Sequence, residues 1–502
     1  MSAMSLNKMS SNEKPADEMC FLSATEQKML LASRRIGARE LLDLHLDRVK
    51  RINPACNAVV TLDEEAARRQ SRAADEKLAR GEAIAPLHGL PMTIKDSFAV
   101  AGMTATCGLE ELRGYRPHED AVAVAKIRAA GAVIFGKTNL PAGAADHQSC
   151  NTLFGLTRNP WDKERTVGGS SGGSAAALAA GLTTLELGSD IGGSIRVPAH
   201  FCGVYGHKPS YGLVGTEGHI PPPPGHIAPA ELGVGGPLAR SAFDLEMLFD
   251  VVLGMSDLDA VGAELRLPAA RHDDLRAFRV AVWNDGQDYP LDDAYAAAIE
   301  GLVEDLARLG VAVTGTARPA IDPAASYDVY LQTLFGIIGA GLPPAAREAL
   351  LAASEAAESG SYPRRIADAV RQSLSQHFAA TEARHQLYRA WRRFFTDYDV
   401  LLCPVTPTVA FPHDIQRLDL AAQFTRRLKV NGGTIPYMDN LAWPGLVTVA
   451  NLPATAIPTG RRIGSVPAGV QVVGPYLGDR TTLRFAQLVE QAFGGFARPP
   501  GI

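Results

Sequence analysis

The sequence predicts an α/β fold in one large unit, with a β-sheet carrying helices on its faces. Three observations lead to this prediction. Short apolar runs alternate with amphipathic helical stretches, and the connections between them are short. Of the 502 residues, 46% are hydrophobic and 21% are charged, which is the composition of an ordinary globular chain with a large core. No internal repeat divides the chain.

The N-terminal half is expected to alternate helix and strand after a polar tail. We interpret residues 1–21 as a mobile tail and residues 22–502 as the folded domain. Ser23 is of the residue type that caps helix N-termini. The expected helices cover 24–34, 39–53, 64–82 and 120–131, and the expected strands cover 91–95 and 132–135.

Beyond a stretch rich in Gly and Ser at 160–215, the alternation resumes. Strands are expected at 278–283, 399–405 and 468–476, and helices at 292–310, 325–398 and 480–493. The rings of Trp391, Phe394, Phe395 and Tyr398 would suit either a lid, a membrane-touching cap or a packed core. Aromatic residues more often pack inside, so we expect these rings to pack onto the body of the domain.

Charge and cysteine content exclude several classes of protein. The chain has 49 Lys+Arg against 54 Asp+Glu, so it offers no basic face for a nucleic acid. The six cysteines are far apart and form no CxxC pair, which argues against a zinc site or a disulfide framework, and Cys403 is expected as a buried thiol. The polar N-terminus has no apolar signal-peptide core, and no apolar run could span a membrane. A cytoplasmic protein without metal or cofactor is the resulting expectation.

One motif matches a phosphate-binding loop in form. GAVIFGKT at 131–138 fits the pattern GxxxxGK[ST], which works when glycine-rich backbone wraps a phosphate before a helix. Here the intervening residues are apolar, as in a strand, and Pro141 follows where a helix should start. A nucleotide-binding protein is kept as the alternative from a different functional class.

Three further blocks form a more informative set. PMTIKDS places Lys95 at the end of a buried strand, and TVGGSSGGSAAALAAG places Ser170 and Ser171 before an Ala-rich helix. GSDIGGSIR places Ser194 directly after two glycines. Glycine tolerates the backbone angles that point several N–H groups the same way, and such a group of donors can form an oxyanion hole.

These blocks resemble the amidase signature family of serine hydrolases. The resemblance extends from RINPACNAVV and HGLPMTIKD through GAVIFGKTNLP and FGLTRNPW to GVGGPLARSAFDL, and more weakly to NLPATAIPTG and GVQVVGPY. It implies one amidase signature domain built on a central mixed β-sheet covered by helices on both faces. The core would cover about 85–215, and 325–398 would be a helical insert.

The resemblance also implies a role for each site residue. Ser194 resembles the acyl-forming nucleophile, and Lys95 resembles the general base. Ser170 resembles the serine that bridges these two, and the resemblance implies a cis peptide bond between Gly169 and Ser170. Lysine is normally protonated, but burial can lower its pKa by several units, roughly 3–5 at most, so that it can accept a proton. The implied oxyanion hole consists of the N–H groups of Ile191, Gly192, Gly193 and Ser194. Supporting residues would be Gly169, Ser171 beside the lysine, and a bracing pair of Asp190 and Arg196.

The sequence also offers candidates for the substrate pocket. In the family, the loop that corresponds to 144–155 lies near the substrate, so His147, Gln148 and Cys150 would either line the pocket or lie on the surface. The segment 219–231, with its run of four prolines, is a candidate wall for the acyl or leaving group.

The resulting functional prediction is a hydrolase that cleaves the C–N bond of a hydrophobic or aryl amide, with carbamates (urethanes) and esters as further candidates. The apolar segments 434–448 and 221–229 favour such substrates. The alternative within the family is the glutamine-hydrolysing subunit of a tRNA-dependent amidotransferase, which would need a partner protein and a polar pocket. The expected partners are a small-molecule substrate and water, with no nucleic acid and no membrane, and the chain is expected to be a monomer or homodimer.

Overall fold

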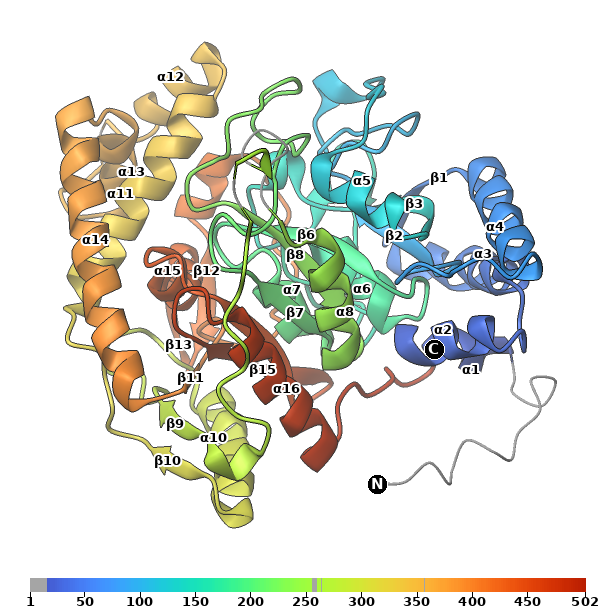
Figure 1. The fold of residues 1–502 in the computed structure, drawn as a ribbon. Coiled ribbons are helices and arrows are strands. Elements are labelled where there is room, and N and C mark those ends of the chain that lie inside the picture. Colours follow the sequence, from blue (N-terminus) through green and yellow to red (C-terminus); the bar gives the residue numbers. More distant parts are fainter. Residues whose placement is uncertain (1–15, 255–259, 263, 356) are drawn as a thin grey trace.

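A mixed sheet of 11 strands runs through the centre of the computed structural model, which describes residues 16–254, 260–262, 264–355 and 357–502 (Figure 1). In spatial order the strands are β1 (Val59–Leu62), β3 (Val133–Thr138), β2 (Pro91–Lys95), β6 (Glu186–Asp190), β8 (Val234–Ala239), β7 (Tyr205–Lys208), β14 (Ala454–Ile463), β15 (Val466–Val473), β11 (Val400–Cys403), β9 (Arg279–Val282) and β10 (Ala312–Thr314). Two small hairpins, β4 (Cys150–Asn151) with β5 (Gly155–Leu156) and β12 (Arg427–Val430) with β13 (Gly433–Pro436), lie outside it. The predicted α/β fold is confirmed.

Two neighbouring strands of this sheet position the functional residues. β2 and β6 are parallel, with Thr93 opposite Glu186 and Ile94 opposite Leu187. The carboxyl ends of parallel strands open at the same edge of a sheet, which is where α/β proteins commonly place their sites. Lys95 therefore lies beside the segment that follows Asp190.

Helices cover both faces of the sheet. α8 and α16 pack against each other and against β8, β14 and β15, while α6 and α7 pack against β6, β8, β14 and β15. The helices that surround the sheet are α1 (Ala16–Phe21), α2 (Ala24–Ala32), α3 (Ala38–Cys56), α4 (Glu64–Ala79), α5 (Val122–Ala129), α6 (Gly172–Ala179), α7 (Arg196–Cys202), α8 (Ala242–Val252), α10 (Asp293–Leu309), α15 (Ala442–Thr448) and α16 (Asp479–Phe493).

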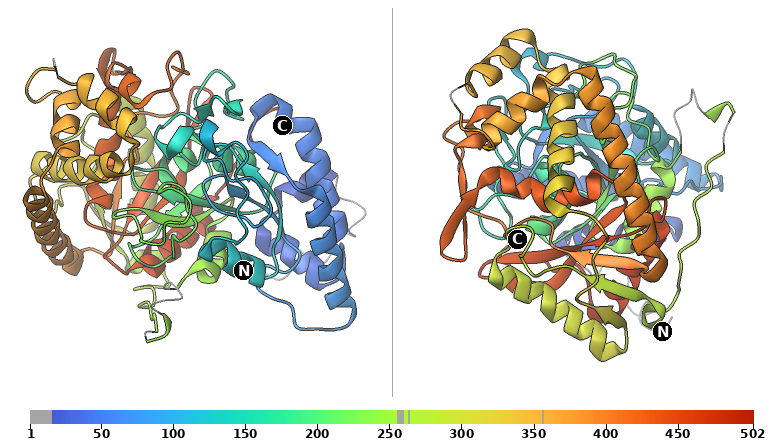
Figure 2. Two further views of the ribbon diagram at one scale, coloured as in Figure 1. Left: turned by 90° about the horizontal axis from the view of Figure 1, so that it is seen from above. Right: turned by 90° about the vertical axis from the view of Figure 1, so that its left-hand side faces the viewer.

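The predicted helical insert forms a group of four helices at one side of the molecule, seen face-on in the right panel of Figure 2. They are α11 (Pro323–Gly341), α12 (Pro344–Ala352), α13 (Tyr362–Val370) and α14 (Leu374–Asp397). Trp391, Phe394 and Phe395 of α14 are buried in a core cluster, and the partly buried Tyr398 packs against it. The expectation that these four rings pack onto the body is confirmed. In the part of the chain that the structure describes, no helix is long and apolar enough to cross a membrane.

The tail predicted over 1–21 is wrong from residue 16 onward. Ala16–Phe21 forms α1, in which Met19 and Cys20 are buried, and Asp17 makes an ion pair of 2.9 Å with Arg48 of α3. Two apolar side chains and one buried arginine partner are enough to dock this turn of helix. Residues 1–15 lie outside the described residues.

The phosphate-loop alternative is also wrong. Residues 133–138 of the motif form β3, an interior strand buried along its whole length, so their backbone groups pair within the sheet. Lys137 is fully buried and its Nζ lies 3.2 Å from Asp96 Oδ1. A lysine that neutralises a core carboxylate is not available to a nucleotide.

Candidate active site

Lys95 is the centre of the site. It is the last residue of β2, its side chain is fully buried, and its Nζ lies 2.7 Å from Ser170 Oγ and 2.9 Å from Ser189 Oγ. Burial lowers the pKa of Lys95 to about 7, because an ammonium ion is poorly solvated in the interior. An amine that is substantially neutral near pH 7 therefore contacts two hydroxyl groups.

The loop before α6 supplies Ser170. The peptide bond between Gly169 and Ser170 is cis, as the family resemblance implies. A Cβ at position 169 would lie 2.2 Å from the carbonyl oxygen of Asp146, so only glycine fits there. Ser171, which we expected to help hold the lysine, instead hydrogen-bonds the backbone of Ser189 and donates its N–H to the Ser194 carbonyl at 3.0 Å. Ser171 thus ties together the two loops that carry the serines.

Two residues that the sequence analysis missed complete the lysine's surroundings. Ser189 Oγ lies 2.9 Å from His219 Nε2, and His219 Nδ1 lies 2.9 Å from the Pro221 carbonyl oxygen. Burial lowers the pKa of His219 to about 3, so the ring is neutral. A carbonyl only accepts hydrogen bonds, so Nδ1 carries the ring hydrogen and Nε2 accepts the hydrogen of Ser189.

This chain of bonds fixes the role of each group around the amine. Because Ser189 donates to His219, its oxygen accepts an N–H from Lys95. The neutral amine keeps a second N–H and its lone pair, and the lone pair is the part that can take a proton from Ser170. The signal for this arrangement in the sequence was weak, since His219 begins the proline-rich segment that we predicted to wall the substrate. The segment does not line the pocket beside Ser194, and His219 instead stands behind Ser189.

A buried ion pair shapes the loop that carries Ser194. Asp190 and Arg196 are fully buried and 2.8 Å apart, and Asp190 also accepts the N–H groups of Gly193 at 2.9 Å and Ile195 at 3.0 Å. Burial alone would raise the pKa of Asp190, but the charge and hydrogen bonds of Arg196 hold it well below its ordinary value. These contacts hold the end of β6 against the start of α7, on either side of the loop that carries Ser194.

The predicted set of four oxyanion donors needs correction. The Gly193 N–H already points to Asp190, and this glycine has a φ of 99°, which favours glycine over other residues. Among the described residues, the N–H groups of Ile191, Gly192 and Ser194 have no protein acceptor. Three donors, rather than four, are therefore available to a substrate oxygen.

Ser194 opens into a pocket of about 60 Å³, which is room for roughly four to six water-sized groups. The pocket wall is largely apolar and comes from α11, from the 3₁₀ helix Tyr437–Leu441 and from the loop after residue 143. Its lining consists of Ala144, Ala145, Asp146, His147, Ile191, Gly192, Ser194, Leu334, Phe335, Ile338, Leu420, Gln423, Tyr437, Met438, Asn440 and Leu441. The predicted contribution of segment 434–448 is therefore observed.

The three pocket candidates from the 144–155 loop separate in the structure. His147 lines the pocket, and its Nε2 donates to the Gly192 carbonyl at 2.9 Å. Gln148 is buried outside the lining, where its amide exchanges two hydrogen bonds with the backbone of Asp414. Cys150 lies in β4 and is likewise not part of the lining. Of these three residues, His147 is the one placed to meet a substrate.

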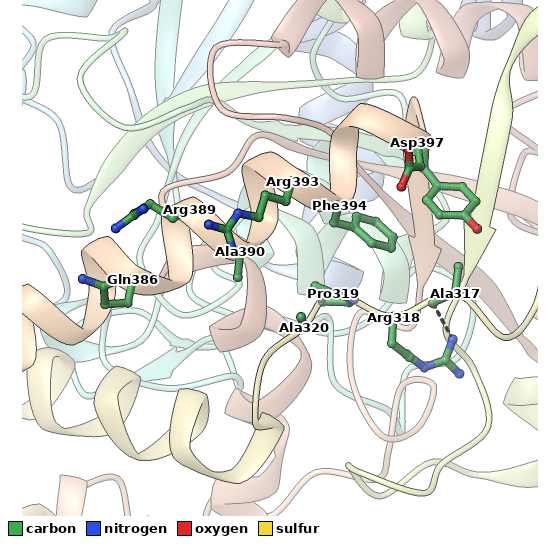
Figure 3. A pocket seen from close by; sticks show the side chains of 11 residues that line it. Ala317, Arg318, Pro319, Ala320, Gln386, Arg389, Ala390, Arg393, Phe394 and Asp397 are labelled. Atoms are coloured by element: carbon green, nitrogen blue, oxygen red, sulfur yellow. Dashed lines mark hydrogen bonds between the residues drawn. The ribbon is translucent and has the colours of Figure 1, made fainter.

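Other hollows lie away from these residues. Figure 3 shows one of about 500 Å³ between α14 and the segment 317–320, with Arg389 and Arg393 on the helix and Arg318 opposite. None of the predicted site residues lines it. Within the described residues, no group of three or more His, Cys, Asp or Glu side chains is arranged to hold a metal ion.

The family model for amidases matches residues 40–483. The chain is 34% identical over 497 residues to a glutamyl-tRNA(Gln) amidotransferase subunit of Acidothermus cellulolyticus, covering 94% of each chain. Among solved structures, it is similar to an amidase (TM-score 0.75, 30% identity, 94% of this chain and 99% of that one). It is also similar to a 6-aminohexanoate cyclic dimer hydrolase complexed with substrate (TM-score 0.75, 27% identity, 96% and 99%). The chain belongs to the amidase signature family, and it is an enzyme that acts on C–N bonds.

Proposed function

We propose that this protein hydrolyses an uncharged, largely apolar amide through Ser194, Ser170 and Lys95. The observation that carries the proposal is the buried Lys95 amine, which contacts hydroxyl groups instead of carboxylates and lies next to the loop of Ser194. A serine hydroxyl becomes a strong nucleophile only when a base removes its proton, and a neutral amine is such a base.

The first half-reaction forms an acyl-enzyme. Ser194 Oγ attacks the substrate carbonyl, its proton passes to Ser170, and the Ser170 proton passes to Lys95. The N–H groups of Ile191, Gly192 and Ser194 stabilise the negative oxygen that develops. Among the described residues the Ser194 hydroxyl has no hydrogen-bond partner, so the transfer to Ser170 requires the two hydroxyls to close up when substrate binds.

The first half-reaction ends when the leaving group departs: the protonated lysine returns its proton through Ser170 to the leaving nitrogen, and the amine leaves as a neutral molecule. The second half-reaction uses the same groups. Water attacks the Ser194 ester and gives its proton through Ser170 to Lys95, and that proton returns to Ser194 Oγ as the C–O bond to Ser194 breaks and the acid leaves. The same steps apply to an ester or a carbamate, since only the leaving group or the acyl substituent differs.

The pocket supports an apolar substrate. Leu334, Phe335 and Ile338 of α11 face it together with Met438 and Leu441, and no Arg or Lys is found among the described residues that line it. A free amino acid such as glutamine carries a carboxylate that needs a cationic partner when it is buried. This lining favours a neutral amide instead.

The second candidate is a glutamine-hydrolysing amidotransferase subunit, because the relative from Acidothermus cellulolyticus carries that name. In that case the isolated chain would be inactive on apolar amides, and glutaminase activity would depend on a partner protein. The first candidate predicts a monomer or homodimer that is active alone, which size-exclusion chromatography of the active fraction tests.

A substrate panel distinguishes the two candidates. The purified chain is assayed with p-nitroanilides, aryl carbamates, esters, primary amides and glutamine. We expect turnover of anilides and esters and none of glutamine. A fluorophosphonate probe should label the wild type and a Ser354→Ala variant, which lacks a buried serine in the helical insert, but not Ser194→Ala. Labelling that persists in Ser194→Ala would refute the assignment of the nucleophile.

A further inference from the structure

Asn440 combines two properties that few of the described side chains share. It is 1% exposed, and neither its Nδ2 nor its Oδ1 has a hydrogen-bond partner among the described residues. It also lines the pocket that contains Ser194. Buried side-chain amides almost always form hydrogen bonds, so an amide whose donor and acceptor both lack a partner needs an explanation.

The other unpaired buried groups do not face this pocket. Trp283 and Trp391 each leave one indole N–H unpaired, and Ser97 and Ser326 each leave one hydroxyl, all outside the pocket lining. Asn440 is therefore the residue of the pocket wall that has an unused donor and an unused acceptor. Each of these two atoms has less than 1 Å² of exposed surface, so a substrate group reaches them only when the wall moves apart.

The surroundings of Asn440 define what could pair with it. The wall of the pocket also contains the apolar residues Met438, Leu441 and Leu334. A ligand group that binds beside Asn440 therefore loses its hydration shell. Among the described lining residues there is no lysine or arginine for a charged group, and Asp146 is already paired with Arg426 and accepts the Tyr437 hydroxyl at 2.5 Å. A neutral group with its donor and acceptor side by side matches the amide edge of asparagine.

We infer that Asn440 is a specificity-determining residue that binds a second uncharged amide-like group of the substrate, such as a primary carboxamide, a lactam or a urea. This inference rests on the proposed function and adds to it the class of substrate. The substrate then has a scissile amide at Ser194, an apolar body, and an amide-like group that pairs with Asn440 through two hydrogen bonds.

The test uses substrates of equal shape. Anilides are prepared with acyl chains of several lengths that end in a carboxamide, in a methyl ketone, which lacks the donor, or in an isopropyl group, which lacks both donor and acceptor. A second series carries the same three groups on the aniline ring. In at least one series we expect kcat/KM of the wild type to fall by about tenfold or more from carboxamide to isopropyl, because the asparagine is left unpaired.

The variant Asn440→Leu keeps the size of the side chain and removes both polar atoms. It should abolish or reverse the preference for the carboxamide, whereas Asn284→Leu, an asparagine outside the pocket, should keep it. Asn440→Leu should also melt at the same or a higher temperature than wild type, because replacing an unpaired buried amide by an apolar group relieves its desolvation. A purely structural asparagine would give a lower melting temperature.

Each outcome decides the inference. Equal kcat/KM values for the carboxamide and isopropyl substrates in both series would overturn it, because no substrate group would then form a hydrogen bond with Asn440. A preference that survives in Asn440→Leu, or a marked destabilisation by that change, would also overturn it while leaving the hydrolase assignment intact. If no anilide is cleaved and the fluorophosphonate does not label Ser194, the proposed function fails, and the inference fails with it.

Discussion

Lys95 and Lys137 stand on adjacent parallel strands, β2 and β3, and both side chains are fully buried, yet their surroundings differ completely. Lys137 Nζ lies 3.2 Å from the Asp96 carboxylate and 2.8 Å from the Phe98 carbonyl. Lys95 Nζ contacts the hydroxyls of Ser170 and Ser189, and within the described residues it makes no ion pair. The same residue type, equally buried, is a structural cation in one strand and a candidate base in the next.

This difference teaches that burial alone does not make a lysine a base. Burial disfavours the charged form of a lysine side chain, and a carboxylate within ion-pair distance favours it. Hydroxyl groups can form hydrogen bonds with an amine without stabilising its protonated form as strongly as a carboxylate does, and they can also exchange protons with it. The partner of each amine therefore decides its chemistry.

The largest effect on activity is expected from Lys95→Met. Methionine fills the apolar space but cannot accept a proton, so kcat/KM at neutral pH should fall by roughly 10²–10⁴-fold. Because Lys95 makes no ion pair within the described residues, the fold should persist, which circular dichroism can check. A variant with the wild-type rate would exclude Lys95 as the base.

The corresponding change at the other lysine should act on stability. Lys137→Met leaves the Asp96 carboxylate buried without its cation, and we expect a loss of about 3–5 kcal/mol in the free energy of unfolding. Urea unfolding measures it, and the double variant Lys137→Met with Asp96→Asn should recover much of the loss. If Lys137→Met has the same free energy of unfolding as the wild type, the ion pair between Lys137 and Asp96 does not contribute to stability.

A third change makes Lys95 resemble Lys137. In the wild type, the active form is the neutral amine, so kcat/KM should rise as pH increases through about 7 and level off above it. Ser189→Asp places a carboxylate beside Lys95, which should raise its pKa and lower the neutral-pH rate by roughly tenfold for each pKa unit. Activity should return in alkaline solution, whereas Ser189→Ala should keep the midpoint near 7. An unshifted profile for Ser189→Asp would contradict this comparison.

The smallest effect should come from His219, which contacts Lys95 only through Ser189. In His219→Leu the Ser189 hydroxyl is free to donate to the lysine's lone pair, so we expect roughly a tenfold or smaller loss in kcat. His219→Gln supplies another acceptor and should restore part of it. Equal rates for both variants would show that the direction of this hydrogen bond does not matter.

The sequence by itself determined the fold class and the three blocks that meet at the site. Glycines at 169, 192 and 193, the serines beside them and the strand before Lys95 are local patterns, and such patterns can be predicted because a few neighbouring residues set them. The same locality indicated that the phosphate-like motif is a strand, since its apolar residues and Pro141 are visible in the chain directly.

Only the tertiary structure decided which partners those residues meet. Ser189 replaced Ser171 as the lysine's second contact, Asp190 took one of the expected oxyanion donors, and His219 came to the site from a segment predicted to wall the pocket. In the sequence, Asn440 is one of several polar residues in the segment 434–448. Only the tertiary structure places it in the wall of the pocket, together with residues of α11. Hydrogen-bond partners distant in sequence depend on the packing of the whole sheet and its helices, and no spacing along the chain encodes them.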